Sequence, residues 1–239
     1  MDNESYSHHI SRQFNEELDE LRSHALEMGG LVEQQVADCV SALIELDVSK
    51  AEDIRQKDKI VNAMELRIDD ECAKILAKRQ PAASDLRLIL TTTKMIADLE
   101  RIGDEAGKIA LHAIGLAETG TESQGFVEIR HLGALVRQMV HHALDAFARI
   151  DCDKALQVAQ ADKKADLEYA SALREMMSVM MEDPRSISRI LNVIWALRSL
   201  ERIGDHARNI AEHVIYLDKG KDVRHLDLTA MEKALTPKS

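Results

Sequence analysis

The sequence contains few aromatic residues, few prolines and few cysteines. Aromatic residues make up 3 % of the 239 positions, with 3 prolines and 3 cysteines. Cys39, Cys72 and Cys152 lie far apart and form no Cys-x-x-Cys pair, so we expect reduced thiols and not a disulfide framework. With a formal net charge of −11 and 1 tryptophan, the chain would repel a phosphate backbone and stack few bases. Nucleic acid is therefore excluded as a partner.

Long apolar runs are also absent. The N-terminus, MDNESYSHHI, lacks a basic region followed by an apolar segment. No stretch approaches the roughly 18 apolar residues that a membrane span requires. We therefore expect a cytoplasmic protein.

The residues that are abundant are those typical of helices. Hydrophobic residues make up 45 % and charged residues 31 % of the chain, and Ala, Leu, Glu, Lys, Met and Arg dominate, all of them strong helix formers. No segment has the β-branched and aromatic residues, bounded by turn residues, that mark strands. The composition predicts an all-α fold.

Apolar residues spaced by three and four positions predict six long helices. They cover about residues 7–46, 50–80 and 84–118 in the first half and about 127–150, 154–182 and 184–219 in the second. The Gly- and Thr-rich stretch from Glu118 to Gly125 separates the halves, as turn-forming residues between periodic segments do. We therefore predict a first three-helix bundle over 1–120, a second over 126–220 and a short C-terminal tail over 221–239.

The two halves are similar in sequence, which predicts an internal duplication. Asp47-Val-Ser-Lys-Ala aligns with Asp151-Cys-Asp-Lys-Ala at an offset of 151 − 47 = 104. Glu100 aligns with Glu201 at an offset of 201 − 100 = 101, so only small deletions separate the halves. A period of this length indicates duplicated bundles, because solenoid repeats are far shorter.

The motif that repeats most strictly is Leu-Glu-Arg-Ile-Gly-Asp, at 99–104 and again at 200–205. On a helix, Glu100 and Asp104 lie one turn apart on the same face, as do Glu201 and Asp205. Like charges at this spacing, together with a glycine between them, oppose helix stability by about 1 kcal/mol. A bound cation would explain the arrangement, because paired carboxylates supply oxygen ligands and glycine lets a neighbouring helix come close.

The preceding helix of each half adds acidic and amide side chains on one face. These are Asp58, Asn62 and Glu65 in the first half and Asp162 and Asp166 in the second. The predicted metal ligands are therefore Glu100, Asp104, Asp58 and Asn62 in one half, and Glu201, Asp205, Asp162 and Asp166 in the other. All-oxygen ligands suit Mg, Mn, Ca and oxidised Fe alike, and Zn is a further candidate, so the metal stays unidentified.

Two other interpretations stay open. Cationic residues within one or two turns could neutralise the acids as ion pairs, which would make this a metal-free structural helical protein: Lys94, Arg101, Lys108, Arg198, Arg202 and Arg208. A carboxylate-bridged metalloenzyme is the other. Helical oxygen-activating sites add histidines at Glu-x-x-His spacing, whereas His112 and His213 lack that spacing and are expected at the surface or at a helix cap. No phosphate loop or nucleophile elbow is present, so we predict a non-enzymatic protein.

Five segments carry a resemblance to a known family. They are SRQFNEEL at 11–18, MGGLVEQQ at 28–35, AKRQPAASDLR at 77–87 and the two LERIGD segments. Over essentially its full length the chain resembles the PhoU family, whose members are described as two three-helix bundles with metal clusters on Glu/Asp-x-x-x-Asp motifs. The resemblance implies the same role for Glu100 with Asp104, Glu201 with Asp205, and Asp162 with Asp166. In the first half the match is Asp58 with Asn62, a departure that bears on how fully that cluster is occupied.

The function that this resemblance implies is regulatory. Members of the family hold the phosphate-starvation (Pho) regulon off when phosphate is plentiful and modulate phosphate import. The implied partners are the ATPase subunit of the phosphate ABC transporter and the phosphate sensor histidine kinase. The resemblance thus implies a homodimeric, metal-binding adapter that reaches the membrane only through its partners.

Overall fold

A computed structural model describes residues 2–119 and 126–235, and within them the protein is built from helices and contains no strand. The long helices are α1 (Asp2–Glu45), α2 (Val48–Lys78), α3 (Ala83–Glu118), α4 (Phe126–Arg149), α5 (Cys152–Glu182) and α6 (Ile187–Lys219). A 3-10 turn, η1 (Pro184–Ser186), leads into α6, and a short helix, α7 (Leu228–Leu235), follows it. The all-α prediction is confirmed. No described helix combines the length and the apolar character needed to cross a membrane.

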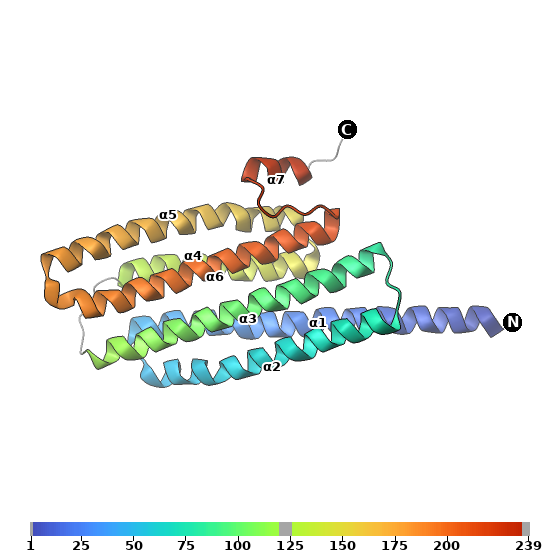
Figure 1. Ribbon diagram of the computed structural model, residues 1–239, viewed down its shortest axis with the longest axis horizontal. Coiled ribbons are helices and arrows are strands. Elements are labelled where there is room, and N and C mark those ends of the chain that lie inside the picture. The colour runs from blue at the N-terminus through green and yellow to red at the C-terminus, as the bar shows by residue number, and fades with distance from the viewer. Residues whose placement is uncertain (1, 120–125, 236–239) are drawn as a thin grey trace.

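The helices form two layers of parallel and antiparallel rods (Figure 1). One layer holds α5, α6, α3 and α2 in that order, and α4 and α1 lie behind it (Figure 1). The most extensive contact joins α3 to α6, at the centre of the molecule. The buried apolar side chains of all six long helices form a continuous core, so the two halves are packed together over their length.

The duplication is visible in the turns that join the first two helices of each half. Leu46 and Ile150 both have a φ of 54°, in the left-handed region. The next residue caps the following helix: Asp47 accepts a hydrogen bond from the Lys50 backbone N–H at 3.0 Å, and Asp151 accepts one from Lys154 at 2.9 Å. Aspartate at a helix N-cap satisfies a backbone donor that the helix leaves unpaired. The sequence match at offset 104 therefore reflects a repeated local structure.

The contact between α1 and α4 repeats in the same way. A Cβ added to Gly29 would clash with Leu144 Cδ2, and one added to Gly133 would lie 2.9 Å from Val40 Cγ1. The two contacts are equivalent at the offset of 104, because 29 + 104 = 133 and 40 + 104 = 144. Each half thus uses a glycine to admit a bulky side chain of the other.

The α3–α6 contact contains a buried polar network around Asp98. Oδ1 of Asp98 lies 2.8 Å from His206 Nδ1 and accepts from Asn209 Nδ2 at 3.1 Å, while Oδ2 lies 3.2 Å from His213 Nε2. Burial alone would raise the pKa of Asp98, but these hydrogen bonds outweigh it and lower the pKa to about 2. An ionised carboxylate only accepts, so the two facing histidine nitrogens carry hydrogen.

The segment after α6 differs from the simple tail that the sequence analysis predicted. Gly220, with a φ of 65°, ends α6, and α7 then packs against α5 with Met231 fully buried. The division of the chain at 1–120, 126–220 and 221–239 stays a prediction. Of the predicted linker, Glu118 and Thr119 are described, and residues 120–125 lie outside the described residues.

Candidate metal centres

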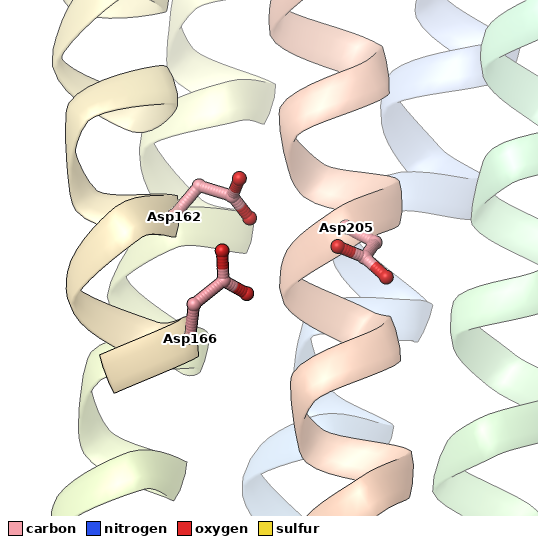
Figure 2. Close-up of side chains that lie close together, drawn as sticks. All are labelled: Asp162, Asp166 and Asp205. Atoms are coloured by element: carbon pink, nitrogen blue, oxygen red, sulfur yellow. The ribbon is translucent and has the colours of Figure 1, made fainter. Parts of the chain in front are cut away.

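The second half brings three predicted ligands together. Asp162 and Asp166 stand one turn apart on α5 and point towards Asp205 on α6 (Figure 2). Each offers one carboxylate oxygen, and these oxygens all lie within 4.8 Å of one another. Carboxylate oxygens at this separation can share one hard cation, whose metal–oxygen distances are about 2.0–2.6 Å. With Glu201, these three residues form what we call the second cluster.

Glu201 belongs to this cluster through its charge. Burial, followed by repulsion from Asp205, raises the pKa of Glu201. Burial and repulsion from Asp162 and Asp166 likewise raise the pKa of Asp205. Glu201 Oε2 is buried and has no hydrogen-bond partner among the described residues. A buried acceptor without a partner is costly, and a cation would satisfy it.

Two arginines also pair with the second cluster. Arg208 Nη1 donates to Asp162 Oδ2 at 2.9 Å, and its Nε donates to Glu212 at 2.9 Å. Arg198 Nη1 donates to Glu201 Oε1 at 2.6 Å. Arg208 lowers the pKa of Asp162, but burial outweighs it, so the pKa stays above its ordinary value. The ion-pair interpretation left open by the sequence is therefore realised at two positions.

The first half carries its predicted ligands on α2 and α3, and we call Asp58, Asn62, Glu65, Glu100 and Asp104 the first cluster. Within the described residues, no three of its carboxylates bring oxygens within 4.8 Å of one another, unlike the triad of the second cluster. Burial and then repulsion from Asp104 raise the pKa of Asp58. The same two causes, with Glu65 added, raise the pKa of Glu100. The four carboxylates therefore act on one another, as their spacing predicts.

Within the described residues, no arginine or lysine pairs with the first cluster in the way that Arg198 and Arg208 pair with the second. Among the described residues, none of Asp58, Glu65, Glu100 and Asp104 makes an ion pair within 4.0 Å. Arg101 lowers the pKa of Glu65 and of Glu100 only as a smaller influence than burial. Asp58 Oδ1 and Asn62 Oδ1 are buried without a hydrogen-bond partner in the described chain. The oxygens that a metal would use are thus left available.

Sequence reasoning missed Gln35 of α1. Its side chain is 1 % exposed, and neither its Oε1 nor its Nε2 has a partner among the described residues. A Cβ added to Gly103 would lie 3.3 Å from Gln35 Oε1 and 3.5 Å from Asp58 Oδ1. Gln35 therefore lies beside the glycine of the motif, next to the first cluster, and offers one more oxygen there. Gln35 could not be predicted from the spacing of the acids, because it lies on α1 and the acids lie on α2 and α3.

The remaining cations and the histidines are placed as follows. Arg202 Nη1 and Lys108 Nζ both pair with buried Glu105, at 2.7 and 2.9 Å, and Lys94 lies over the Tyr216 ring. His213 is 7 % exposed and bonded to Asp98, so its expected place at the surface or at a cap is wrong. His206, Asn209 and His213 share the α6 face that meets α3, a heptad spacing that could have indicated burial.

The donor sets fit a hard cation. Carboxylate and amide oxygens alone are available in both clusters, a set that suits Mg, Mn, Ca and oxidised Fe and places softer metals such as Zn second. The unpartnered acceptors and the raised carboxylate pKa values both mark sites where positive charge would be stabilising. Glycine at 103 and 204 keeps the neighbouring helices close to the acids, because the nearest side-chain atoms lie 3.3 and 3.4 Å from the Cβ that each lacks.

A repeated three-helix unit with an acidic motif on its third helix defines a class of duplicated helical proteins. The PhoU domain matches residues 25–113 and 129–214 of the chain. The chain belongs to the PhoU family. The resemblance noted in its motifs is thereby confirmed.

Relatives and solved structures agree with this assignment. The chain is 62 % identical over 230 residues to the phosphate-specific transport system accessory protein PhoU homolog of Pseudomonas aeruginosa, covering 96 % of this chain and 95 % of that one. It is 45 % identical to the PhoU of Escherichia coli K12, covering 100 % and 98 %. A crystal structure of PhoU from Pseudomonas aeruginosa matches with a TM-score of 0.85 at 62 % identity, covering 87 % of this chain and 100 % of that one. The phosphate transport system regulatory protein PhoU from Streptococcus pneumoniae matches with a TM-score of 0.81 at 32 % identity, covering 88 % and 99 %.

Proposed function

We propose that this protein is a non-enzymatic, metal-binding signalling adapter of phosphate uptake. It represses the phosphate-starvation regulon when phosphate is plentiful and modulates import by coupling the ATPase subunit of the phosphate transporter to the sensor histidine kinase. It works in the cytoplasm as a homodimer and meets the membrane only through these partners. The observation that carries the proposal is full-length similarity to relatives named as accessory proteins of phosphate-specific transport.

Features of the fold support an adapter. Long helices present extended faces of the kind that receive partner helices or loops, and large apolar side chains such as Trp195, which is 56 % exposed, lie on those faces. The name of the Streptococcus pneumoniae neighbour describes a regulatory protein of a phosphate transport system.

The two clusters support metal binding as part of this function. We propose Asp58, Asn62, Glu100 and Asp104 as ligands of one centre and Asp162, Asp166, Glu201 and Asp205 as ligands of the other. Glu65 and Gln35 could supply additional oxygen ligands to the first centre. A multivalent cation would neutralise carboxylates that repel one another across two helices, and would thereby tie α2 to α3 and α5 to α6.

Co-purification tests the adapter proposal directly. The tagged full-length protein should retain the transporter ATPase and the sensor kinase in two separate pull-downs. An unrelated acidic helical bundle with the same tag serves as the control. If neither partner is retained at any phosphate concentration, the adapter proposal is wrong.

The ion pairs of Arg208 and Arg198 favour a second candidate for the second cluster alone, a metal-free structural role. Elemental analysis separates the two roles. Protein stripped with a chelator, reloaded with Mn²⁺ and desalted should carry metal at both clusters if both are binding sites. If the second cluster is structural, the Glu201→Gln/Asp205→Asn variant will retain as much metal as the unchanged protein.

A further inference from the structure

A groove opens beside the second cluster, between α6 and the segment that follows it. Its lining residues are Arg202, Asp205, His206, Arg208, Asn209, Glu212, Arg224 and His225. Three arginines from two separate segments therefore meet in one depression. Planar guanidinium groups match the oxygens of phosphate and carboxylate in pairs, so this concentration of arginine indicates an anion.

Each of the three arginines still has donors to offer. Arg202 bonds Glu105 through Nη1, Arg224 bonds Asp222 through Nε and Nη2, and Arg208 uses Nε and Nη1. A guanidinium group carries five N–H donors. The acids thus hold the arginines in place and leave some of their N–H donors free.

Two further side chains of the groove are fixed by the buried network. His206 Nδ1 and Asn209 Nδ2 both bond Asp98. This leaves the second N–H of Asn209 as a donor for a ligand, while Nε2 of a neutral His206 is a hydrogen-bond acceptor. Because Asp98 is buried and bonded at both oxygens, it acts as a positioning residue that holds these side chains at the edge of the groove.

The charge of the groove depends on the second cluster. The lining carries three arginines against the carboxylates of Asp205 and Glu212. The arginines also pair with Glu105, Asp222 and Asp162, so five carboxylates face three arginines when no metal is bound. Asp205 belongs both to the groove and to the candidate metal triad, and Arg208, which also lines the groove, has its Nη1 engaged by Asp162 of that triad. A divalent cation on the triad would add two positive charges and displace the Arg208 guanidinium from Asp162.

We propose that this groove binds a phosphoryl oxyanion, with inorganic phosphate as its simplest form, and that metal at the second cluster strengthens this binding by releasing Arg208. The inference rests on the metal binding put forward under the proposed function. The first half has no counterpart, because Gly107 and Leu111 stand at the positions equivalent to Arg208 and Glu212 at the offset of 101. The site therefore belongs to the second half alone.

Calorimetric titration of the full-length protein with inorganic phosphate tests this inference. Measurements are made on chelator-treated and Mn²⁺-loaded samples whose metal content is determined in parallel. We expect binding that is at least tenfold tighter in the loaded sample. Arg224→Gln should weaken phosphate binding at least tenfold. Arg185→Gln is the matched control, since Arg185 makes the same bond to an aspartate two residues earlier, Asp183, far along the chain from the groove, and it should change nothing.

The outcomes separate this inference from the metal proposal. A sample that holds metal but binds no phosphate, or whose binding is unchanged in Arg224→Gln, overturns the groove and leaves the metal centres standing. A sample that holds no metal and binds no phosphate overturns both. A phosphoserine peptide forms a second arm: tighter binding of the peptide than of free phosphate, lost in Arg224→Gln, supports the groove with the phosphoryl group carried by a partner. Thermal unfolding of each variant confirms that it is folded.

Discussion

In the second cluster, Arg208 and Arg198 lie within ion-pair distance of Asp162 and Glu201, whereas the equivalent positions of the first half are Gly107 and Ala97, at the offset of 101. The difference continues below the motif glycines, where Gly103 meets Gln35 and Gly204 meets Met139. Those two residues are also equivalent, because 35 + 104 = 139. The two halves share a backbone arrangement. The second cluster has paired arginines and an apolar side chain, Met139, beneath its motif glycine, whereas the first cluster has no paired arginine and has the polar Gln35 at that position.

Identical motifs therefore need not have equal metal affinities. A cation that takes Asp162 Oδ2 in the second cluster competes with Arg208, while one bound at Asp58 Oδ1 and Asn62 Oδ1 of the first cluster meets oxygens that have no partner among the described residues. Among the four proposed ligands of each centre, charge acts in the other direction, because Asn62 stands where the second centre has the carboxylate of Asp166. Substitutions at these residues will show whether competition from Arg208 or the charge of the ligands has the larger effect on metal affinity.

Removing a carboxylate from either cluster should have the largest effect. We expect Asp104→Ala and Asp205→Ala each to weaken metal binding by about 100-fold at their own cluster, since each loses a ligand oxygen and its charge. The fold should persist, because both side chains are exposed and exposed carboxylates contribute little to stability. Elemental analysis and circular dichroism measure the two effects. Unfolding of either variant would mean that these acids are structural.

Releasing the second cluster from its arginine comes next. Arg208→Gln should tighten metal binding there by about tenfold, or about 1.4 kcal/mol. It should also lower the free energy of unfolding of the metal-free protein by about 1–3 kcal/mol, because Asp162 and Glu212 lose a partner. The control is Arg137→Gln on the exposed face of α4. Unchanged metal affinity would show that the Arg208 pair does not compete with metal.

The residue beside the motif glycine of the first cluster, Gln35, can be replaced by its equivalent in the second half, a methionine. Gln35→Met should raise the free energy of unfolding of the metal-free protein by about 1 kcal/mol, because a buried amide without partners is costly. The same change should weaken metal binding at the first cluster if Gln35 supplies an oxygen. Urea unfolding with and without metal measures both, and Met139→Gln provides the reverse exchange. A loss of stability in the Gln35→Met variant would show that the amide has a partner.

Adding the missing carboxylate should have a smaller effect. Asn62→Asp should tighten metal binding at the first cluster by roughly threefold, since affinity rises with the charge of the ligands. The metal-free protein should become slightly less stable, because the new charge lies one turn from Asp58. Competition with a fluorescent chelator measures the affinity, with Asn62→Gln as the neutral control. Equal gains in the two variants would rule out charge as the cause.

The pH dependence should distinguish the clusters from the Asp98 network by its sign. Above the ordinary carboxyl pKa near 4, the raised native pKa values of Glu100 and Glu201 make the native state bind more protons than the unfolded state, so stability rises as pH falls towards that ordinary pKa. The gain is small because these groups are partly exposed, and bound metal should abolish it. Asp98, whose pKa falls from 3.8 to about 2, acts oppositely and loses its contribution below pH 4. Urea unfolding with and without chelator tests this, and a gain that persists with metal bound would contradict it.

Much of the fold could be predicted because its signals are local. Helix periodicity, the aspartates at 47 and 151 and the repeated motif all act within a few turns of one helix. The partners of Arg208 and Gln35 could not be predicted, because they depend on which neighbouring helix each side chain meets. Six cations lay near the acids, and only the packing decided that Arg198 and Arg208 pair with them while Arg202 pairs with Glu105. Helix α7 was missed because its eight residues are fewer than the 11–18 residues over which a helical period is read from a sequence.

The reciprocal contacts of Gly29 with Leu144 and of Gly133 with Val40 have a consequence for how the halves can differ. A surface patch that pairs with its own copy is the arrangement found in two-fold symmetric dimers, and here both copies lie on one polypeptide. In a dimer of identical subunits every substitution appears twice, so an arginine introduced at one acidic site would be introduced at both. Because the two halves are fused in one chain, each can change separately. One acidic cluster can therefore have paired arginines while the other, on the same helical arrangement, has none.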